Sequence, residues 1–296
     1  MKNRMLKIKR TKRERKDRNR RNLLERITSK QAGFFFAAFL LLHSFQGLAQ
    51  KENYPFVPGE TALYGAYFNW HFIWINAGDV LFKSDTISYK QQKAWHLKAI
   101  GKTFKAYDML YTVRDTFESI LTYPGFDPLW FRRAVNHGHG HSLHQYTFSQ
   151  KEGKITSHIQ YDDEKPVTGK MDWSKGVYDL LSSAYYFRGY EFEKMKRGQK
   201  VNFRMVVDNT SEELYFRYLG TEKVKTRSNR EFLCHKVSVW LLEGDFFPEG
   251  EYMKVWFTAD KNRLPVMVET KILVGSVKAI LLNEQKLKYP LTSEIE

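Results

Sequence analysis

The stretch that decides the fold class is Ala62–Trp74, which reads ALYGAYFNWHFIW. In its second half, large aromatic residues recur at every second position, namely Phe68, Trp70, Phe72 and Trp74. In an extended chain, residues two apart lie on the same face. The pattern therefore predicts a β-strand with an aromatic face.

A hairpin is predicted to follow this strand. Asn76–Asp79 has the residue types of a turn, and Val80–Tyr89 resembles the returning strand. Turn residues separate further stretches that are rich in β-branched and aromatic residues. The additional predicted strands are Trp95–Thr103, Thr112–Thr122, Leu129–Val135, Leu143–Ser149, Ile155–Tyr161, Lys200–Val207, Glu213–Leu219, Phe232–Leu242, Tyr252–Ala259, Leu264–Val274 and Ser276–Leu282.

One segment, at about residues 175–190, has a helical period instead. Its apolar positions are Val177, Leu180, Leu181, Ala184 and Phe187. Asp172 or Ser174 is available as the N-cap. We therefore expect a mainly β domain in which antiparallel strands form a strongly curved sheet or partly open barrel with one mid-chain helix. An outer-membrane barrel is the rival, but the helix and the charges on both strand faces fit it poorly.

The positive charge of the chain is concentrated at its start. The 296 residues carry a net charge of +15, of which residues 1–30 contribute +11. Residues 51–296 hold 34 basic and 30 acidic residues. This near balance lacks the basic surface that binding to a nucleic-acid backbone requires, so we expect no nucleic-acid partner.

The first 49 residues have the organisation of a basic leader and signal peptide. The basic segment precedes an apolar run of eleven residues, 32–42, and small residues at Gly47 and Ala49 precede a cut before Gln50. This run is shorter than the roughly twenty residues of a membrane span. We expect residues 50–296 to form a single exported domain, periplasmic or outer-membrane-associated in a Gram-negative-type envelope. An uncleaved signal anchor is the alternative.

Several motifs resemble an exported bacterial family, domain-of-unknown-function family 3108. The motifs are Pro58-Gly59-Glu60 with Tyr64, Ala77-Gly78 at the hairpin, Val113-Arg114-Asp115, Asp179-Leu180-Leu181-Ser182 through Arg188, Leu264-Pro265-Val266 and Val274-Gly275-Ser276-Val277. The resemblance implies an envelope location and a β-rich fold, without an established activity. At the level of the fold it is similar to the half-open barrels that carry lipids or lipoproteins across the periplasm.

A histidine-rich stretch is the only metal-like signal. His137, His139 and His141 alternate with glycines, and neighbouring pairs of them could chelate a metal ion from one strand face. No local carboxylate or fourth ligand completes the site. We therefore favour a flexible hairpin tip with solvated histidines and expect at most weak metal binding.

The aromatic ladder of Phe68, Trp70, Phe72 and Trp74 has two interpretations. It could line a cavity for an acyl chain or another apolar ligand. Aromatic residues at every second position of a strand more often pack in the hydrophobic core, and we favour that interpretation of these four residues.

Three other residues have mainly structural interpretations. Cys234 is the single cysteine, which excludes an intrachain disulfide, and we interpret it as a small apolar residue. Asp179 and Arg188 lie nine positions apart in the predicted helix, too far for a helical pair, so we expect capping or pairing to a strand.

The sequence contains no nucleophile elbow, P-loop, dinucleotide fingerprint or His-Glu-x-x-His pair. We therefore expect no cofactor and favour a non-enzymatic envelope protein that binds or carries a hydrophobic, lipid-like component. Its expected partner is a hydrophobic small molecule or lipid, with membrane contact but without a transmembrane span in the mature chain. The alternatives are an envelope scaffold or glycan-interaction module and, third, an enzyme acting on glycan or lipid.

Overall fold

The computed structural model describes residues 54–70, 73–107, 112–138, 140–241, 250–271 and 276–295. Residues 50–296 form one compact unit, to which all the described elements belong. Among the described residues, no helix combines the length and the apolar character that a membrane crossing needs.

The described part is mainly β. Its strands are β1 (Glu60–Trp70), β2 (Ile73–Tyr89), β3 (Gln92–Thr103), β4 (Arg114–Thr122), β5 (Pro128–His137), β6 (Gly140–Ser149), β7 (Lys154–Tyr161), β8 (Val167–Asp172), β9 (Val177–Tyr178), β10 (Lys200–Val207), β11 (Thr210–Lys225), β12 (Glu231–Leu241), β13 (Gly250–Thr258), β14 (Pro265–Lys271), β15 (Ser276–Gln285) and β16 (Glu294–Ile295). The helices are α2 (Leu180–Phe187) and the 3₁₀ turns η1 (Lys105–Tyr107) and η2 (Phe192–Lys194).

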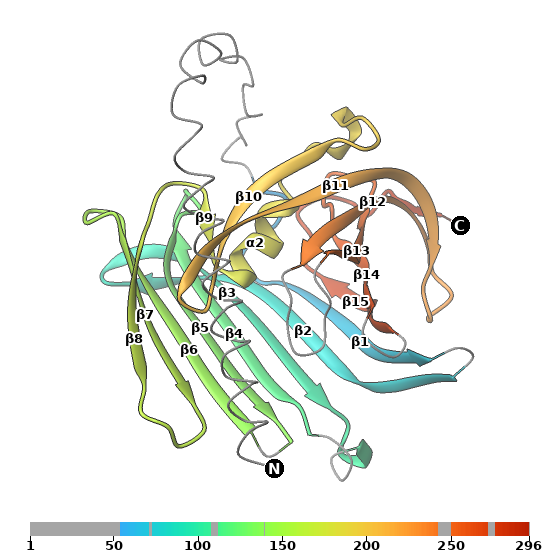
Figure 1. Ribbon diagram of the computed structural model, residues 1–296. Helices are drawn as coiled ribbons and strands as arrows, with labels where there is room; N and C mark the ends of the chain where they lie inside the picture. The colour runs from blue at the N-terminus through green and yellow to red at the C-terminus, as the bar shows by residue number, and fades with distance from the viewer. Residues whose placement is uncertain are drawn as a thin grey trace, which may run out of the picture. The chain divides into compact units, whose positions relative to one another are not determined.

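All of these strands belong to one sheet (Figure 1). The order runs from β8 through β1, then from β15 back to β9, with β16 paired to β12. Most neighbours are consecutive and antiparallel, because short turns connect them, and the β1–β15 pair joins the two halves. The end strands β8 and β9 are not paired with each other in the described part. This open, curved sheet confirms the predicted fold class.

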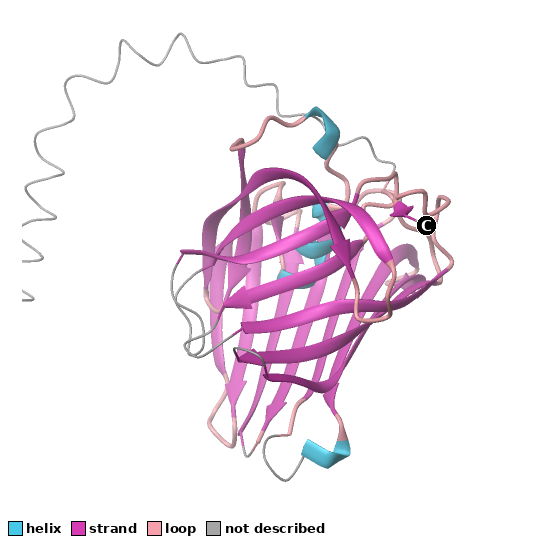
Figure 2. Cartoon of the chain, turned by 90° about the vertical axis from the view of Figure 1, so that its right-hand side faces the viewer, coloured by secondary structure: helices cyan, strands magenta, loops and turns pink. Residues whose placement is uncertain are grey.

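The sheet curves around α2, which lies on its inner side (Figure 2). Cluster 1 packs between α2 and strands β3–β10, and its most buried members include Leu97, Leu121, Phe131, Ile155 and Leu181. Cluster 2 packs where the chain leaves α2 and is built from Phe187, Phe192, Phe203, Phe216, Val237, Phe257 and their neighbours. Burial of these large side chains is the main source of stability of such a domain.

The two ends of the sheet meet through side chains rather than strand pairing. The β10–β11 turn carries Asn209, whose Oδ1 accepts a hydrogen bond of 2.6 Å from Ser157 of β7. Its neighbour Asp208 places Oδ1 3.4 Å from Nδ1 of the buried His144 on β6. The side chains of this turn therefore bridge the two ends of the open sheet.

The predicted boundary of the first hairpin was wrong. The first strand ends at Trp70 and the second begins at Ile73, so Asn76–Asp79 lies inside β2. At that point the pairing of β1 and β2 shifts by one residue, between Ala66 and Tyr67. A Cβ on Gly78 would lie 2.0 Å from the carbonyl oxygen of Lys102, so glycine is needed for the close approach of β3, not for a turn.

The predicted helix exists but is shorter than expected. It begins at Leu180, after Val177 and Tyr178 have formed the short strand β9. Its N-cap is Asp179, not Asp172 or Ser174. The apolar residue at 177 suited a helical period, but its backbone pairs in parallel with β10 instead.

Candidate functional site

The candidate site is a surface groove of about 580 Å³ between the end of the β11–β12 hairpin and strands β2, β14 and β15. Its volume lies within the range of ligand-binding clefts. Its lining residues are Trp74, Glu222, Lys223, Val224, Lys225, Thr226, Arg227, Asn229, Met267, Lys278 and Ile280. Figure 1 shows why they meet: the long β11–β12 hairpin arches so that its turn comes down near β1, β2 and β15.

Strand register builds the floor of the groove. Ile280 of β15 lies opposite Met267 of β14, and Lys278 lies opposite Tyr67 of β1. Directly opposed residues in antiparallel strands share a face. Val268, which follows Met267 and so points to the other face, packs against cluster 2. The groove is therefore on the side of β14 and β15 that faces away from cluster 2.

The turn between β11 and β12 forms the opposite wall. The amide of Thr226 donates to the carbonyl of Arg230 at 2.8 Å, and the Thr226 hydroxyl also contacts this residue. Arg230 is fixed in turn by Glu284 of β15 and Glu294 of β16, with contacts of 2.7–2.8 Å. Hydrogen bonds from Arg230 to both carboxylates raise its pKa. The wall is thus held in place by a forked, charge-assisted contact.

Trp74 and Tyr67 connect the wall to the floor. Their rings pack edge to face with centroids 6.4 Å apart. The Arg227 guanidinium lies 5.9 Å from the Tyr67 ring and 5.1 Å from the Trp74 ring, within the range of cation–π attraction. The Trp74 side chain nevertheless remains 37% exposed, so a ligand can reach it.

Glu222 is the acidic residue among those that line the groove, and neighbouring side chains of the protein donate hydrogen bonds to it. Glu222 accepts hydrogen bonds from the Trp256 indole at 2.6 Å and from Lys236 at 2.9 Å. Burial raises the pKa of Glu222, but these contacts outweigh it and hold the pKa below its ordinary value. Glu222 therefore stays ionised and paired, and its charge is balanced by Lys236.

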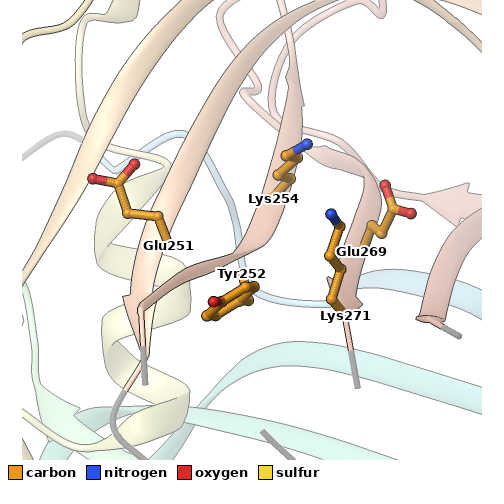
Figure 3. Close-up of a pocket in the computed structure, with 5 residues that line it drawn as sticks. All are labelled: Glu251, Tyr252, Lys254, Glu269 and Lys271. Carbon is orange, nitrogen blue, oxygen red and sulfur yellow. The ribbon is translucent and has the colours of Figure 1, made fainter. Parts of the chain in front are cut away.

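A smaller recess of about 140 Å³ lies on β13 and β14, and Figure 3 shows its lining residues. It contains Glu251, Tyr252, Lys254, Glu269 and Lys271. Hydrogen bonds from Arg217 first, and also from Tyr215 and Ser238, lower the pKa of Glu251 to about 2. This carboxylate has a structural role, and the recess is smaller than typical ligand sites.

The structure separates the predicted aromatic ladder. Phe68 is in β1 and pairs with Ile75, whereas Trp74 is in β2 and pairs with Asn69. Phe68 and Trp74 therefore point to opposite faces. Trp70 ends β1, and Phe72 lies outside the described residues. Of the four, Trp74 lines the groove.

The predicted histidine set is also divided. His137 pairs with Gly140 and His141 with Asn136, which places the two histidines on opposite faces. The His137 ring lies 2.8 Å from Asp115, and the His141 ring lies 3.4 Å from Asp162. His139 lies outside the described residues. Among the residues that are described, no group of three or more His, Cys, Asp or Glu side chains is arranged to hold a metal ion.

The structural interpretations of the remaining residues are confirmed. Asp179 caps α2, accepting hydrogen bonds from the amides of Leu181 and Ser182. Arg188 pairs with Glu60 on β1. Cys234 is fully buried, and burial, with smaller effects of Asp260 and Glu222, raises its thiol pKa to about 12, so the thiol stays protonated.

Sequence reasoning missed most of the groove. The other lining residues lie between 148 and 206 positions away from Trp74 along the chain, and only the fold brings them together. One local signal was available. Lys223, Lys225 and Arg227 alternate just before the turn residues Ser228-Asn229, a basic strand end beside a turn.

The fold and the groove define a mainly β protein with one curved, open sheet and a surface groove that is rich in basic side chains and includes Trp74. A family model described as "Protein of unknown function (DUF3108)" matches residues 64–282. This match covers more than half of the chain, so the chain belongs to that family, as its motifs indicated.

Among solved structures, the chain is similar to a beta-barrel-like protein of the domain of unknown function DUF1849 from Brucella abortus. The TM-score is 0.49 at 7% sequence identity, and the match covers 79% of this chain and 99% of the other. Comparison with curated proteins finds no match.

Proposed function

We propose that the chain is a non-enzymatic cell-envelope protein that binds a hydrophobic, lipid-like envelope component in the groove beside Trp74. The observation that carries this proposal is the combination of an open groove of ligand size with the accessible Trp74 ring and the Met267 side chain in its lining. Met267, which is half-buried, supplies aliphatic surface above the buried Val224 and Ile280, and Trp74 adds an accessible ring. Burial of apolar ligand surface on these side chains would drive binding.

The inner side of the sheet is where a half-open barrel would hold its ligand. Here α2 and clusters 1 and 2 occupy that side with the chain's own side chains. Phe131, Ile155 and Phe216 are each at most 2% exposed. The proposal therefore uses the groove on the other side of β14 and β15.

The envelope location is the second part of the proposal. It is supported by the basic segment of residues 1–30, the apolar run of 32–42 and the small residues before Gln50. N-terminal sequencing of the periplasmic fraction should find a start at or near Gln50. Membrane-bound protein that retains residues 1–30 would contradict cleavage.

A glycan is the competing ligand class. An accessible indole beside polar side chains such as Thr226 and Asn229 is also suited to stacking a sugar ring. A bound lipid and a bound glycan are distinguished by the mass of the bound molecule and by whether delipidation removes it.

Native mass spectrometry tests the proposal on protein isolated from the envelope of bacteria that express the full chain. We expect an additional lipid mass that mild delipidation removes. The variants Trp74→Ala and Met267→Lys should lose it, because they remove the ring or place a charge in the floor. Trp130→Ala, which alters a half-buried tryptophan on β5 outside the groove, should retain it.

Two results would contradict lipid binding in the groove. One is wild-type protein whose mass does not change on delipidation, and the other is a lipid retained equally by both groove variants. A bound glycan mass that survives delipidation and is lost in Trp74→Ala would favour the competing ligand class.

A further inference from the structure

The side chains around Trp74 carry an excess of positive charge. Arg227 and Lys278 each lie 5.1 Å from the Trp74 ring. Four of the groove residues are basic, namely Lys223, Lys225, Arg227 and Lys278, and one is acidic, namely Glu222. An aromatic ring flanked by cations is a surface that attracts an anion with an apolar part.

Internal ion pairs account for only part of this charge. Lys223 lies 3.7 Å from Glu231, and Lys278 lies 3.1 Å from Glu269. Glu222 is matched by Lys236, which is outside the groove lining. Within the described part of the chain, no carboxylate comes within 4.0 Å of the charged groups of Lys225 or Arg227.

Arg227 is presented from a fixed turn. The hydrogen bonds of Thr226 close the turn, and Arg230 anchors it to Glu284 and Glu294. The Arg227 guanidinium also rests against two aromatic rings. A cation held in this way loses less conformational freedom when it binds an anion.

We propose that the groove recognises a phosphate-bearing headgroup, with Arg227 and Lys225 as its charge partners and the apolar part of the ligand on Trp74 and Met267. This inference rests on the proposed function and adds the charge of the ligand to it. The forked guanidinium of Arg227 matches two phosphate oxygens at once. Lys225, two residues away in the same wall, supplies a second positive charge.

Isothermal titration calorimetry tests the proposal with three matched probes on envelope-isolated, delipidated protein. Dihexanoyl-phosphatidic acid carries the phosphate, dihexanoylglycerol has the same chains without it, and inorganic phosphate lacks the chains. At low salt we expect the phosphatidic acid to bind about tenfold more tightly than dihexanoylglycerol, the scale of one charge-assisted hydrogen bond. Added salt should reduce this ratio.

Variants test whether the preference for phosphatidic acid over dihexanoylglycerol depends on Arg227 and Lys225. In Arg227→Gln and in Lys225→Gln, the ratio of the two affinities should fall toward one. Arg217→Gln is the matched control, because Arg217 is an arginine on the same hairpin whose charge is already paired with Glu251. This variant should keep the wild-type ratio.

The outcomes separate the two proposals. Equal binding of phosphatidic acid and dihexanoylglycerol overturns the headgroup inference but leaves lipid binding intact. Inorganic phosphate that binds as tightly as phosphatidic acid supports the anion site and overturns the lipid-like ligand. Failure of all three probes to bind overturns both proposals.

Discussion

Arg188 and Glu60 form a buried ion pair that joins the C-terminal end of α2 to the first residue of β1. The Arg188 guanidinium also donates to the carbonyls of Asn262 and Pro55 at 3.1–3.2 Å. Both side chains are at most 4% exposed. These contacts fix the helix relative to the segment that contains Pro55 and Glu60 and relative to Asn262.

Removal of one partner of this pair should destabilise the fold strongly. Glu60→Ala leaves the charge of Arg188 buried without its carboxylate, and we expect a loss of about 3–5 kcal/mol in the free energy of unfolding. Urea unfolding followed by circular dichroism measures it. The paired replacement Glu60→Leu with Arg188→Met should recover most of the loss, because no unmatched charge remains.

The exposed pair of Lys194 and Glu191, at 2.8 Å, provides the control. Lys194→Ala should change the free energy of unfolding by at most about 1 kcal/mol. A Glu60→Ala protein as stable as the Lys194→Ala protein would show that the buried pair does not hold α2 in place.

Asp179 should give the fold an unusual pH dependence. Burial raises the pKa of this carboxyl to about 6, against the opposing hydrogen bonds from Ser119, Ser182 and Leu181. Between its ordinary pKa and about 6, the folded state binds more protons than the unfolded state, so stability falls as the pH rises. Asp179→Asn keeps the capping oxygen but does not titrate.

Relative to Asp179→Asn, the wild-type protein should therefore gain on the order of 2–3 kcal/mol as the pH falls from about 7.5 to about 4. Urea unfolding of both proteins across this range measures the difference. Asp179→Ala, which also loses the cap, should be less stable than Asp179→Asn by about 1 kcal/mol. A pH-independent difference between wild type and Asp179→Asn would contradict the raised pKa.

Arg230 should control the rigidity of the groove wall without touching a ligand. Arg230→Gln breaks its contacts with Glu284 and Glu294. We expect amide hydrogen exchange at residues 224–230 to become roughly tenfold faster, as the local opening free energy falls by about 1.4 kcal/mol. Arg217→Gln, which breaks a comparable forked pair with Glu251, should leave these amides unchanged. Unchanged exchange in Arg230→Gln would mean that the turn is held by other contacts.

The sequence predicted the fold class well because most strands alternate strongly. The first hairpin was misplaced because Asn76–Asp79 has turn residues, while β1 ends at Trp70 and β2 begins at Ile73, and the sequence at this point carries no turn signal. Strand β8, Val167–Asp172, was missed since its alternation is weak: Met171 is its one residue below 10% exposure. The helix start was misplaced because propensity could not show that Val177 pairs with β10.

The groove could not be predicted because it depends on register and on the arch of β11 and β12. Trp74 was identified as a ligand-binding candidate, but as part of a ladder with Phe68 on one strand face. The reversal of the chain between them sends these two side chains to opposite faces. Met267, Ile280 and Lys278 have no local pattern that distinguishes them from ordinary strand residues.

The central claim is that an amphipathic ligand binds at the groove and not on the inner side of the sheet. Methionine side chains lie both at the groove and on the inner side of the sheet. Met267 lines the groove, while Met171 and Met195 belong to clusters 1 and 2. A change in the environment of each methyl group can therefore be followed separately.

The most direct measurement is an NMR titration of protein labelled with ¹³C in its methionine methyl groups, using dihexanoyl-phosphatidic acid as the ligand. Met267→Leu, Met171→Leu and Met195→Leu assign the three signals. We predict that the Met267 signal shifts progressively to saturation while the signals of Met171 and Met195 stay in place. Shifts of Met171 or Met195 with an unchanged Met267 signal would contradict the account and place the ligand between α2 and the sheet.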